Sequence, residues 1–195
     1  MTDHDRAVQA WYTERFFVTD LGYKCFDWRL LGVAPMIYGR VVLNCGCGYP
    51  LDEMALAPRA ARWVALDFIP AVLERCRAMV PTLPVEWVRG DMRALAFADG
   101  EFHTILDFSS SDHIAEGRAR VRSEAFRVLQ HGGHYVVTFA NRAFYADGLA
   151  DAPGEFGFEH RFSADELQSE LVQAGFTIRY ADMTGARSGV VAVRP

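Results

Sequence analysis

The chain has 195 residues, of which 51% are hydrophobic and 23% are charged. This length and composition predict a single folded domain over residues 1–195 and exclude a disordered chain. The formal net charge is -5, and Lys and Arg are spread thinly along the sequence. Because a nucleic-acid site needs clustered positive charge, we expect no nucleic-acid partner.

The spacing of the cysteines bears on whether the chain binds a metal ion, and its apolar runs bear on its location in the cell. Cys25, Cys45, Cys47 and Cys76 form no CxxC pair and have no matching histidine pair, so we expect no metal site. Reduced thiols of this kind suit the cytoplasm. Residues 2–6 are polar or charged, and no apolar run is long enough to span a bilayer. We therefore expect neither a secretory leader nor a membrane segment, and we predict a cytoplasmic location.

In chain order, segments with strand character alternate with segments of helical spacing. Residues 7–31 predict an aromatic-rich helical segment, part of an expected helical cap over residues 1–38. Apolar runs predict strands at residues 40–44, 62–67, 85–88, 102–108, 134–139, 176–181 and 189–193. Helical spacing or boundary signals predict helices at residues 52–57, 71–79 and 116–130, with one more near the C-terminus. This alternation favours an α/β sandwich with a largely parallel sheet.

Local signals place element boundaries in the second half of the chain. Residues 163–166 have the form of a capping box, which opens a helix expected to stop at Gly175. Gly132 and Gly133 are expected to close the preceding predicted helix, because glycine readily takes the left-handed conformation that ends a helix. Residues 141–162 form a long irregular stretch, which we predict to be a loop that covers the substrate.

Two glycines follow the first predicted strand, where the chain must turn sharply into a helix. Gly46 and Gly48 allow the backbone to approach a nucleotide-like ligand at the carboxyl edge of the sheet. Such turns also join strands to helices for structural reasons alone, so the glycines do not establish a site. Asp67 ends the second predicted strand, where a carboxylate accepts hydrogen bonds from ribose hydroxyls. Nicotinamide-binding and S-adenosylmethionine-binding domains share this arrangement.

Further segments separate these two classes. The chain resembles the class I S-adenosylmethionine (SAM)-dependent methyltransferases, in the order of that family, at residues 42–48, 65–69, 89–92, 95–102, 124–133, 162–167 and 174–176. The resemblance implies a Rossmann-like three-layer sandwich, whose mostly parallel seven-stranded sheet has an antiparallel last strand. It also implies SAM as the cofactor, with Asp91 accepting a hydrogen bond from the adenine amine and Met92 packing on the ring.

The resemblance implies a cofactor site on the chain's own motif positions. These positions are Asn44, Cys45, Gly46, Cys47, Gly48, Asp67, Phe68, Ile69, Asp91, Met92, Asp107 and Phe108. Three positions depart from the family pattern. Asn44 stands where the family has Asp or Glu, Pro50 stands at a glycine position and His103 replaces a frequent Asp. Asn44 can accept a hydrogen bond from the amino end of the cofactor but lacks the negative charge, so a reduced affinity is expected.

Methyl transfer from a sulfonium is an in-line displacement, so the protein mainly aligns donor and acceptor and excludes water. Where the acceptor carries a proton, a base removes it, and histidine has the best matched pKa. His113, with Asp112, follows the predicted strand at 102–108 and is the first candidate; His160 is the second. The alternatives are that Asp112 and His113 cap the next helix and that His160 is a solvated loop residue.

The aromatic residues of the expected cap have two interpretations. Either they close over the site, where a ring attracts a sulfonium by a cation-π contact, or they form a helix face that packs on the sheet. The residues concerned are Tyr12, Phe16, Phe17, Tyr23 and Trp28.

The sequence thus predicts an enzyme that moves the methyl group of SAM to an oxygen, nitrogen, sulfur or carbon atom of a small molecule. One alternative is a non-catalytic SAM-binding module, favoured by the departures at Asn44, Pro50 and His103. Another is a nicotinamide-dependent oxidoreductase, which is disfavoured because the third glycine of that fingerprint is missing. The methyl acceptor and the oligomeric state are left open.

Overall fold

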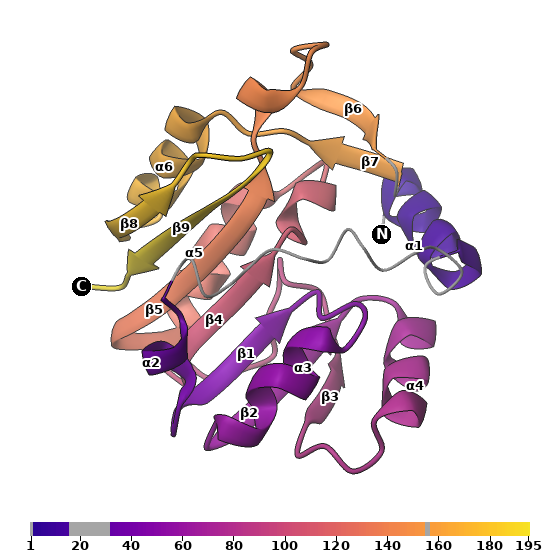
Figure 1. Cartoon of the computed structure of the whole chain (residues 1–195), viewed down its shortest axis with the longest axis vertical. Helices are drawn as coiled ribbons and strands as arrows, with labels where there is room; N and C mark the ends of the chain where they lie inside the picture. The colour runs from indigo at the N-terminus through magenta and orange to yellow at the C-terminus, as the bar shows by residue number, and fades with distance from the viewer. Residues whose placement is uncertain (1, 16–31, 155–156) are drawn as a thin grey trace.

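The computed structural model describes residues 2–15, 32–154 and 157–195. Within these ranges the main sheet has seven strands in the order β3-β2-β1-β4-β5-β9-β8 (Figure 1). In that order they are β3 (Glu86–Arg89), β2 (Arg62–Asp67), β1 (Val41–Cys45), β4 (Phe102–Phe108), β5 (Leu129–Ala140), β9 (Arg187–Val193) and β8 (Thr177–Asp182). Neighbouring strands from β3 to β5 pair in parallel, whereas β9 runs antiparallel to β5 and β8. The predicted sheet with an antiparallel last strand is confirmed.

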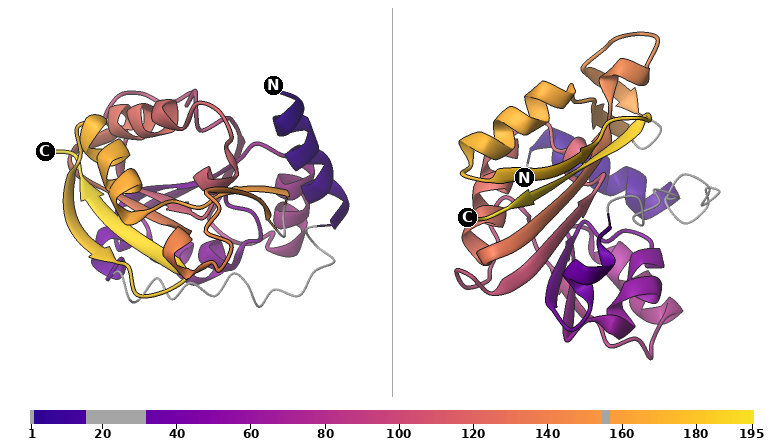
Figure 2. Two further views of the ribbon diagram at one scale, coloured as in Figure 1. Left: turned by 90° about the horizontal axis from the view of Figure 1, so that it is seen from above. Right: turned by 60° about the vertical axis from the view of Figure 1, so that its left-hand side comes forward.

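Helices cover both faces of this sheet (Figure 2). They are α2 (Ala34–Ile37), α3 (Leu51–Leu56), α4 (Pro70–Met79), α5 (Arg118–Val128) and α6 (Ala164–Gln173), whereas α1 (Asp3–Arg15) lies against α4 beyond the carboxyl edge of the sheet. In β1, Val42 belongs to an apolar core with residues of α2, α3 and α4, whereas Leu43 belongs to a core with residues of α5 and α6. Alternate side chains of a strand point to opposite faces, so each face of the sheet has its own helical layer. The three-layer prediction is confirmed.

The long stretch at 141–162 is more regular than predicted. It contains the short helical turn η5 (Arg142–Phe144) and an antiparallel hairpin of β6 (Asp151–Gly154) and β7 (Gly157–His160). Pairing between these strands satisfies backbone groups that an irregular loop would leave to water. The expectation of an irregular loop is therefore wrong for the hairpin.

The predicted end of the helix at 116–130 is also wrong. The helix α5 ends at Val128, and Leu129 is already extended and pairs with Phe102 of β4. Both partners of that pair are fully buried, so apolar packing favours an immediate start of β5. Gly132 and Gly133 consequently lie inside β5 rather than at a helix end.

The predictions for the two ends of the chain have different outcomes. The capping box is confirmed, because Ser163 Oγ accepts a hydrogen bond from the Glu166 N–H at 3.2 Å. Helix α1 confirms helical structure as far as Arg15. The aromatic residues Phe16, Phe17, Tyr23 and Trp28, and the side chain of Tyr12, lie outside what the structure describes. In the described ranges, no helix is long and apolar enough to cross a membrane.

A buried arginine ties α5 to the sheet. Arg122 is fully buried, and its Nη1 donates to Asp107 Oδ2 at 3.0 Å and to Tyr135 Oη at 2.8 Å. Tyr135 in turn donates to the same Asp107 oxygen at 2.8 Å. Burial raises the pKa of Tyr135 well above its ordinary value, so the hydroxyl keeps the proton that it donates. Arg122 Nε also reaches Glu170 of α6 at 3.3 Å, which links both helices of this face to β4 and β5.

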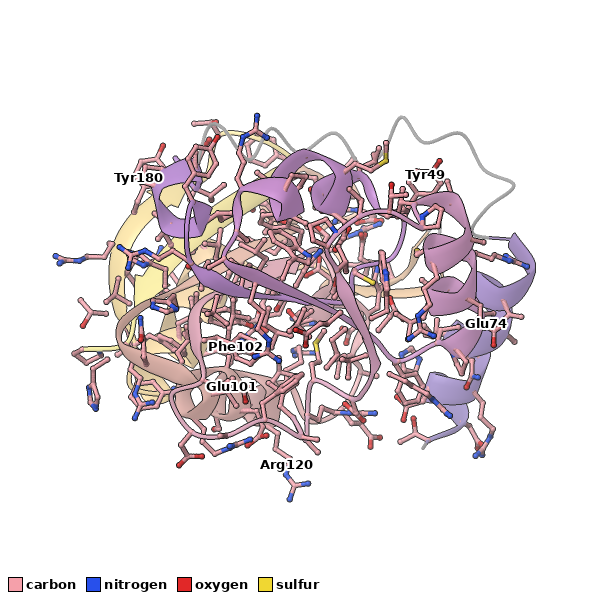
Figure 3. All side chains as sticks on the ribbon, turned by 90° about the horizontal axis from the view of Figure 1, so that it is seen from below. Tyr49, Glu74, Glu101, Phe102, Arg120 and Tyr180 are labelled. Atoms are coloured by element: carbon pink, nitrogen blue, oxygen red, sulfur yellow. The ribbon has the colours of Figure 1, made fainter. Side chains whose placement is uncertain are left out.

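We expect Arg122→Ala to lower the free energy of unfolding by about 3–5 kcal/mol, because it leaves Asp107 buried without its counter-charge. Arg120→Ala is the matched control, since Arg120 lies on the same helix but is exposed and points away from the ribbon (Figure 3). Urea unfolding followed by circular dichroism measures both variants. Equal losses in the two variants would contradict a stabilising role for the buried network.

Candidate functional site

The carboxyl ends of the parallel strands meet at one edge of the sheet, and a cavity of about 190 Å³ lies there. Its walls come from the segments after β1, β2, β3 and β4, together with residues of α1, β5 and β9. The lining residues are Asp5, Val8, Asn44, Gly46, Cys47, Gly48, Asp52, Leu66, Asp67, Phe68, Ile69, Gly90, Asp91, Met92, Arg93, Phe108, Ser109, Ser110, His113, Ile114, Thr138 and Arg187. Open α/β sheets bind their ligands at this edge.

The turn after β1 admits only glycine at one position. Gly46 has a φ of +68°, and a Cβ added there would lie 2.4 Å from Ser110 Oγ. The Gly46 and Cys47 amides donate to the Leu66 carbonyl at 2.7 and 3.0 Å, while Ser110 Oγ donates to the Gly46 carbonyl at 3.0 Å. The backbone of this turn therefore forms one wall of the cavity. Hydrogen bonds to β2 and to the segment after β4 hold the turn in place.

Asp67 joins the end of β2 to that glycine turn. Its Oδ2 accepts a hydrogen bond from the Gly48 N–H at 3.1 Å, and its Oδ1 accepts one from the Ile69 N–H at 2.9 Å. The side chain is 7% exposed and lines the cavity. Each carboxylate oxygen can accept more than one hydrogen bond, so the two backbone amides fix the orientation of Asp67 and leave it able to accept from a ligand.

The Asn44 position, where the sequence departs from the family pattern, has a carboxylate directly behind it. Asn44 lines the cavity, and its Nδ2 donates to Glu53 Oε1 of α3 at 2.7 Å. Trp63 Nε1 donates to the same oxygen at 3.3 Å, and Glu53 is fully buried. The acidic side chain that the family has at position 44 is thus present one hydrogen bond farther from the cavity, on α3.

Arg93 connects the segment after β3 to the N-terminal helix. It donates to both carboxylate oxygens of Asp91, and its Nη2 also donates to Asp5 Oδ2 of α1 at 3.0 Å. Burial raises the pKa of Asp5, but the hydrogen bonds from Arg93 and Thr2 outweigh it, so this pKa lies below its ordinary value. The ion pair holds α1 against the cavity, to which Asp5 and Val8 contribute side chains.

The segment after β4 is held in a strained conformation beside the cavity. Ser109 has a φ of +52°, in the left-handed region that side chains other than glycine rarely adopt. Its N–H donates to the Thr138 carbonyl at 3.0 Å, and the two hydroxyls lie 3.2 Å apart. Strain of this kind persists where the surrounding structure fixes it, and it is frequent at binding sites. Here it brings Ser109, Ser110 and the turn η4 (Ser111–His113) to the cavity.

Of the two candidate residues at η4, His113 lines the cavity and Asp112 lies behind it. Asp112 is fully buried, and its Oδ2 accepts from the Ala140 N–H at 2.9 Å and from Arg187 Nη1 at 3.3 Å. Its Oδ1 has no hydrogen-bond partner among the described residues. Burial raises the pKa of Asp112 to about 7 against the opposing effects of Arg187 and the Ala140 amide, while Asp107 and Glu159 add to the rise.

Three other candidates lie away from this cavity, among the residues that the structure describes. Asp107 faces Arg122 inside the fold and is not among the lining residues of the cavity. Cys45 is 4% exposed, and burial raises the pKa of its thiol. His160 was expected in a loop over the pocket, but it ends β7 with Nδ1 2.6 Å from Asp151 and Nε2 2.8 Å from Glu166. In the described ranges no group of three or more His, Cys, Asp or Glu could hold a metal ion.

Sequence reasoning missed Thr138 and Arg187. Thr138 lies two residues before the end of β5, and its position near the carboxyl edge of the sheet could have identified it. Arg187 begins β9 and pairs with Ala140, the last residue of β5. An antiparallel strand starts at the edge where parallel strands end, so its first residue reaches the site. The predicted start of this strand, at residue 189, lay too late to include Arg187.

Comparisons with known proteins agree with this geometry. The profile of a methyltransferase domain family matches residues 42–133. A probable SAM-dependent methyltransferase of Mycolicibacterium smegmatis is 31% identical over 140 residues, which cover 72% of this chain and 53% of the relative. A fatty-acid O-methyltransferase of the same organism is 32% identical over 123 residues, covering 60% of this chain and 44% of the relative. The chain spans about half the length of the curated relatives it matches first.

A solved SAM-dependent methyltransferase from Mesorhizobium loti has the same fold. It superposes with a TM-score of 0.74 at 17% identity, covering 85% of this chain and 96% of that structure. The fold, the site and the sequence relatives together place the chain in the class I SAM-dependent methyltransferase family. Members of this family use SAM as the methyl donor. None of these comparisons supports a nicotinamide-dependent oxidoreductase.

The buried Asp112 predicts a pH-dependent stability. Its pKa is about 7 in the folded chain, against an ordinary value of 3.8 for an aspartate, so between these values the folded state retains a proton that the unfolded state has lost. Stability contributed by this group therefore falls as the pH rises through that window. The side chain of Asp112→Asn resembles the protonated carboxyl and does not titrate. We expect its free energy of unfolding, relative to that of wild type, to rise by about 2–3 kcal/mol as the pH increases from about 5 to about 8.

Urea unfolding of both proteins at the two pH values measures this gain. Ser188→Ala is the control, because Ser188 is also fully buried but does not titrate, so its difference from wild type is expected to be constant with pH. A constant difference for Asp112→Asn as well would contradict the prediction.

Proposed function

We propose that this chain transfers the methyl group of SAM to a nucleophilic atom of a small molecule. The observation that carries the proposal is the convergence of the glycine turn, the Asp67 carboxylate and the turn at Asp91 and Met92 on one cavity. These segments follow β1, β2 and β3, and all three correspond to the family motifs. Membership in the SAM-dependent methyltransferase family supports the same activity.

The residues around the cavity fit the cofactor. Bound SAM supplies a methyl group on a positively charged sulfur. Gly46 and Gly48 leave room for the ligand beside bare backbone, and Asp67 is oriented to accept from ribose hydroxyls. We assign Phe68, Ile69 and Met92 to apolar contacts with the adenosine. We assign Asn44, supported by Glu53, to the amino end of the cofactor, where their combined negative polarity favours an ammonium group.

Positioning and exclusion of water are the main tasks that remain for the chain. Helix α1 lies against the hairpin β6–β7 and is linked to the cavity by the Arg93–Asp5 ion pair. We therefore propose that residues 1–38 act as a cap and that the single domain extends over residues 1–195. His113 faces the cavity and is the candidate base for acceptors that carry a proton. His160 receives no role in the reaction, because Asp151 and Glu166 hold it elsewhere.

The cavity favours an acceptor with an apolar body, because Val8, Phe108 and Ile114 are among its lining residues. One relative is named a fatty-acid O-methyltransferase and another a phthiotriol/phenolphthiotriol dimycocerosates methyltransferase. We propose a small, lipid-like acceptor for this chain, with neither nucleic acid nor a membrane as partner and with a cytoplasmic location.

Calorimetry with SAM and with S-adenosylhomocysteine tests the binding, and incubation with methyl-labelled SAM and a metabolite panel tests the transfer. We expect both ligands to bind and label to appear in at least one small molecule. Binding without transfer to any acceptor would favour the non-catalytic module. Absence of binding would overturn the proposed function.

Replacing Asp67 should weaken cofactor binding. We expect Asp67→Asn to reduce the affinity for S-adenosylhomocysteine by about 10- to 100-fold, because charge-assisted hydrogen bonds contribute about 1.5–3 kcal/mol. Glu74→Gln is the control, since it removes a carboxylate that is exposed on α4 (Figure 3). Isothermal titration calorimetry compares the variants, and an unchanged affinity in Asp67→Asn would exclude its proposed contact with the ribose.

A further inference from the structure

The strand order divides the cavity into two halves. Gly48 and Asp91 follow β1 and β3, and Asp67 ends β2, on one side of the sheet centre. The other half is built by the neighbouring strands β4, β5 and β9, which contribute Ser109, Thr138 and Arg187 among others. If the cofactor occupies the first half, as the proposed function requires, the second half remains for the methyl acceptor.

This second half contains a guanidinium group. Two arginines line the cavity, Arg93 and Arg187. Arg93 directs its donors to Asp91, to Asp5 and to the carbonyl of Glu116. Arg187 donates Nη1 to Asp112 at 3.3 Å and Nη2 to Glu159 at 2.8 Å. A guanidinium has five N–H groups, so Arg187 keeps donors that these two carboxylates do not use.

The partners of Arg187 hold it in place. Asp112 is fully buried and Glu159 is 5% exposed, so both carboxylates are fixed by the surrounding fold. Glu159 also pairs with Arg161, whose Nε lies 3.4 Å from it and whose Nη1 is held by Asp147 at 2.8 Å. Burial disfavours the charged form of Asp112 and raises its pKa to about 7, so near neutral pH this carboxylate neutralises Arg187 less than a fully ionised one would. A pre-oriented guanidinium with unused donors favours binding of an oxyanion.

We propose that Arg187 binds the carboxylate of the methyl acceptor, and that the acceptors of this chain are carboxylic acids with an apolar body. The inference rests on the proposed function and specifies its substrate class. A carboxylate oxygen forms the new O–CH₃ bond while the C–S bond of the sulfonium breaks, and the electron pair of that bond stays on sulfur. The products are a methyl ester and a neutral thioether. A carboxylate has already lost its proton, so His113 is not needed as a base for this acceptor.

Decanoate and 1-decanol form a matched pair of probes, with the same carbon chain and different head groups. Protein saturated with S-adenosylhomocysteine is titrated with each probe by calorimetry, and methyl transfer is measured separately with labelled SAM. We expect decanoate to bind and to give methyl decanoate, and 1-decanol to do neither. Failure of decanoate to bind the loaded protein overturns the inference, as does equal methylation of the alcohol. If S-adenosylhomocysteine itself does not bind, the proposed function fails first.

Variants test whether Arg187 is the anchor. We expect Arg187→Gln to weaken decanoate binding and raise the KM for decanoate by about tenfold or more, with the affinity for S-adenosylhomocysteine unchanged. Arg161→Gln is the matched control, because Arg161 also pairs with Glu159 but is not among the described cavity-lining residues. Arg187→Lys retains the charge that Asp112 and Glu159 need for folding, and it should raise the same KM by a smaller factor. Unchanged KM in both Arg187 variants, or an equal rise in Arg161→Gln, overturns the inference.

Discussion

Parallel pairing of the strands from β3 to β5 is the constraint on which the candidate site depends. It brings the carboxyl ends of all these strands to one edge, so segments that are far apart in sequence line the same cavity. The Asp67–Gly48 hydrogen bond of 3.1 Å fixes the relative positions of β1 and β2 at that edge. A shift of one residue between these strands would turn Asp67 to the opposite face of the sheet. The register is thus also a condition for the chemistry of the site.

Local sequence signals predict the fold and the half of the cavity at the ends of β1, β2 and β3. They do not predict the half formed by β4, β5 and β9. Gly46 and Asp67 could be identified because backbone geometry and strand position leave few other roles for them. The orientation of Asp107 could not be predicted, since a place near a strand end does not reveal which face the side chain occupies. Its neighbour Phe108 faces the cavity, while Asp107 faces Arg122. For His160, the hydrogen-bond partners that draw it away from the cavity are apparent only in the folded chain.

The Asn44 position shows what a comparison of motifs alone leaves out. By position alone, the exchange of an acid for an amide removes a charge from the cavity. In the fold, Glu53 of α3 lies 2.7 Å from the Asn44 amide, and the indole of Trp63 also donates to it. A fully buried carboxyl group is costly unless hydrogen bonds compensate for its lost hydration, and these two donors provide that compensation at Oε1. An acidic side chain thus stands on the adjacent helix, behind the strand position where the family has one.

The antiparallel last strand gives the second half of the cavity its charge. Because β9 starts where the parallel strands end, its first residue, Arg187, lies beside Ala140 at the edge that carries the site. A mobile arginine would lose side-chain entropy on binding an anion, whereas Asp112 and Glu159 have already ordered this one. The same two carboxylates offset the positive charge of Arg187. The electrostatic potential in the cavity therefore depends on the extent to which burial keeps Asp112 protonated. The orientation of the guanidinium and the net charge around it are therefore set by one buried cluster, which lies next to the place where an acceptor would meet the methyl group.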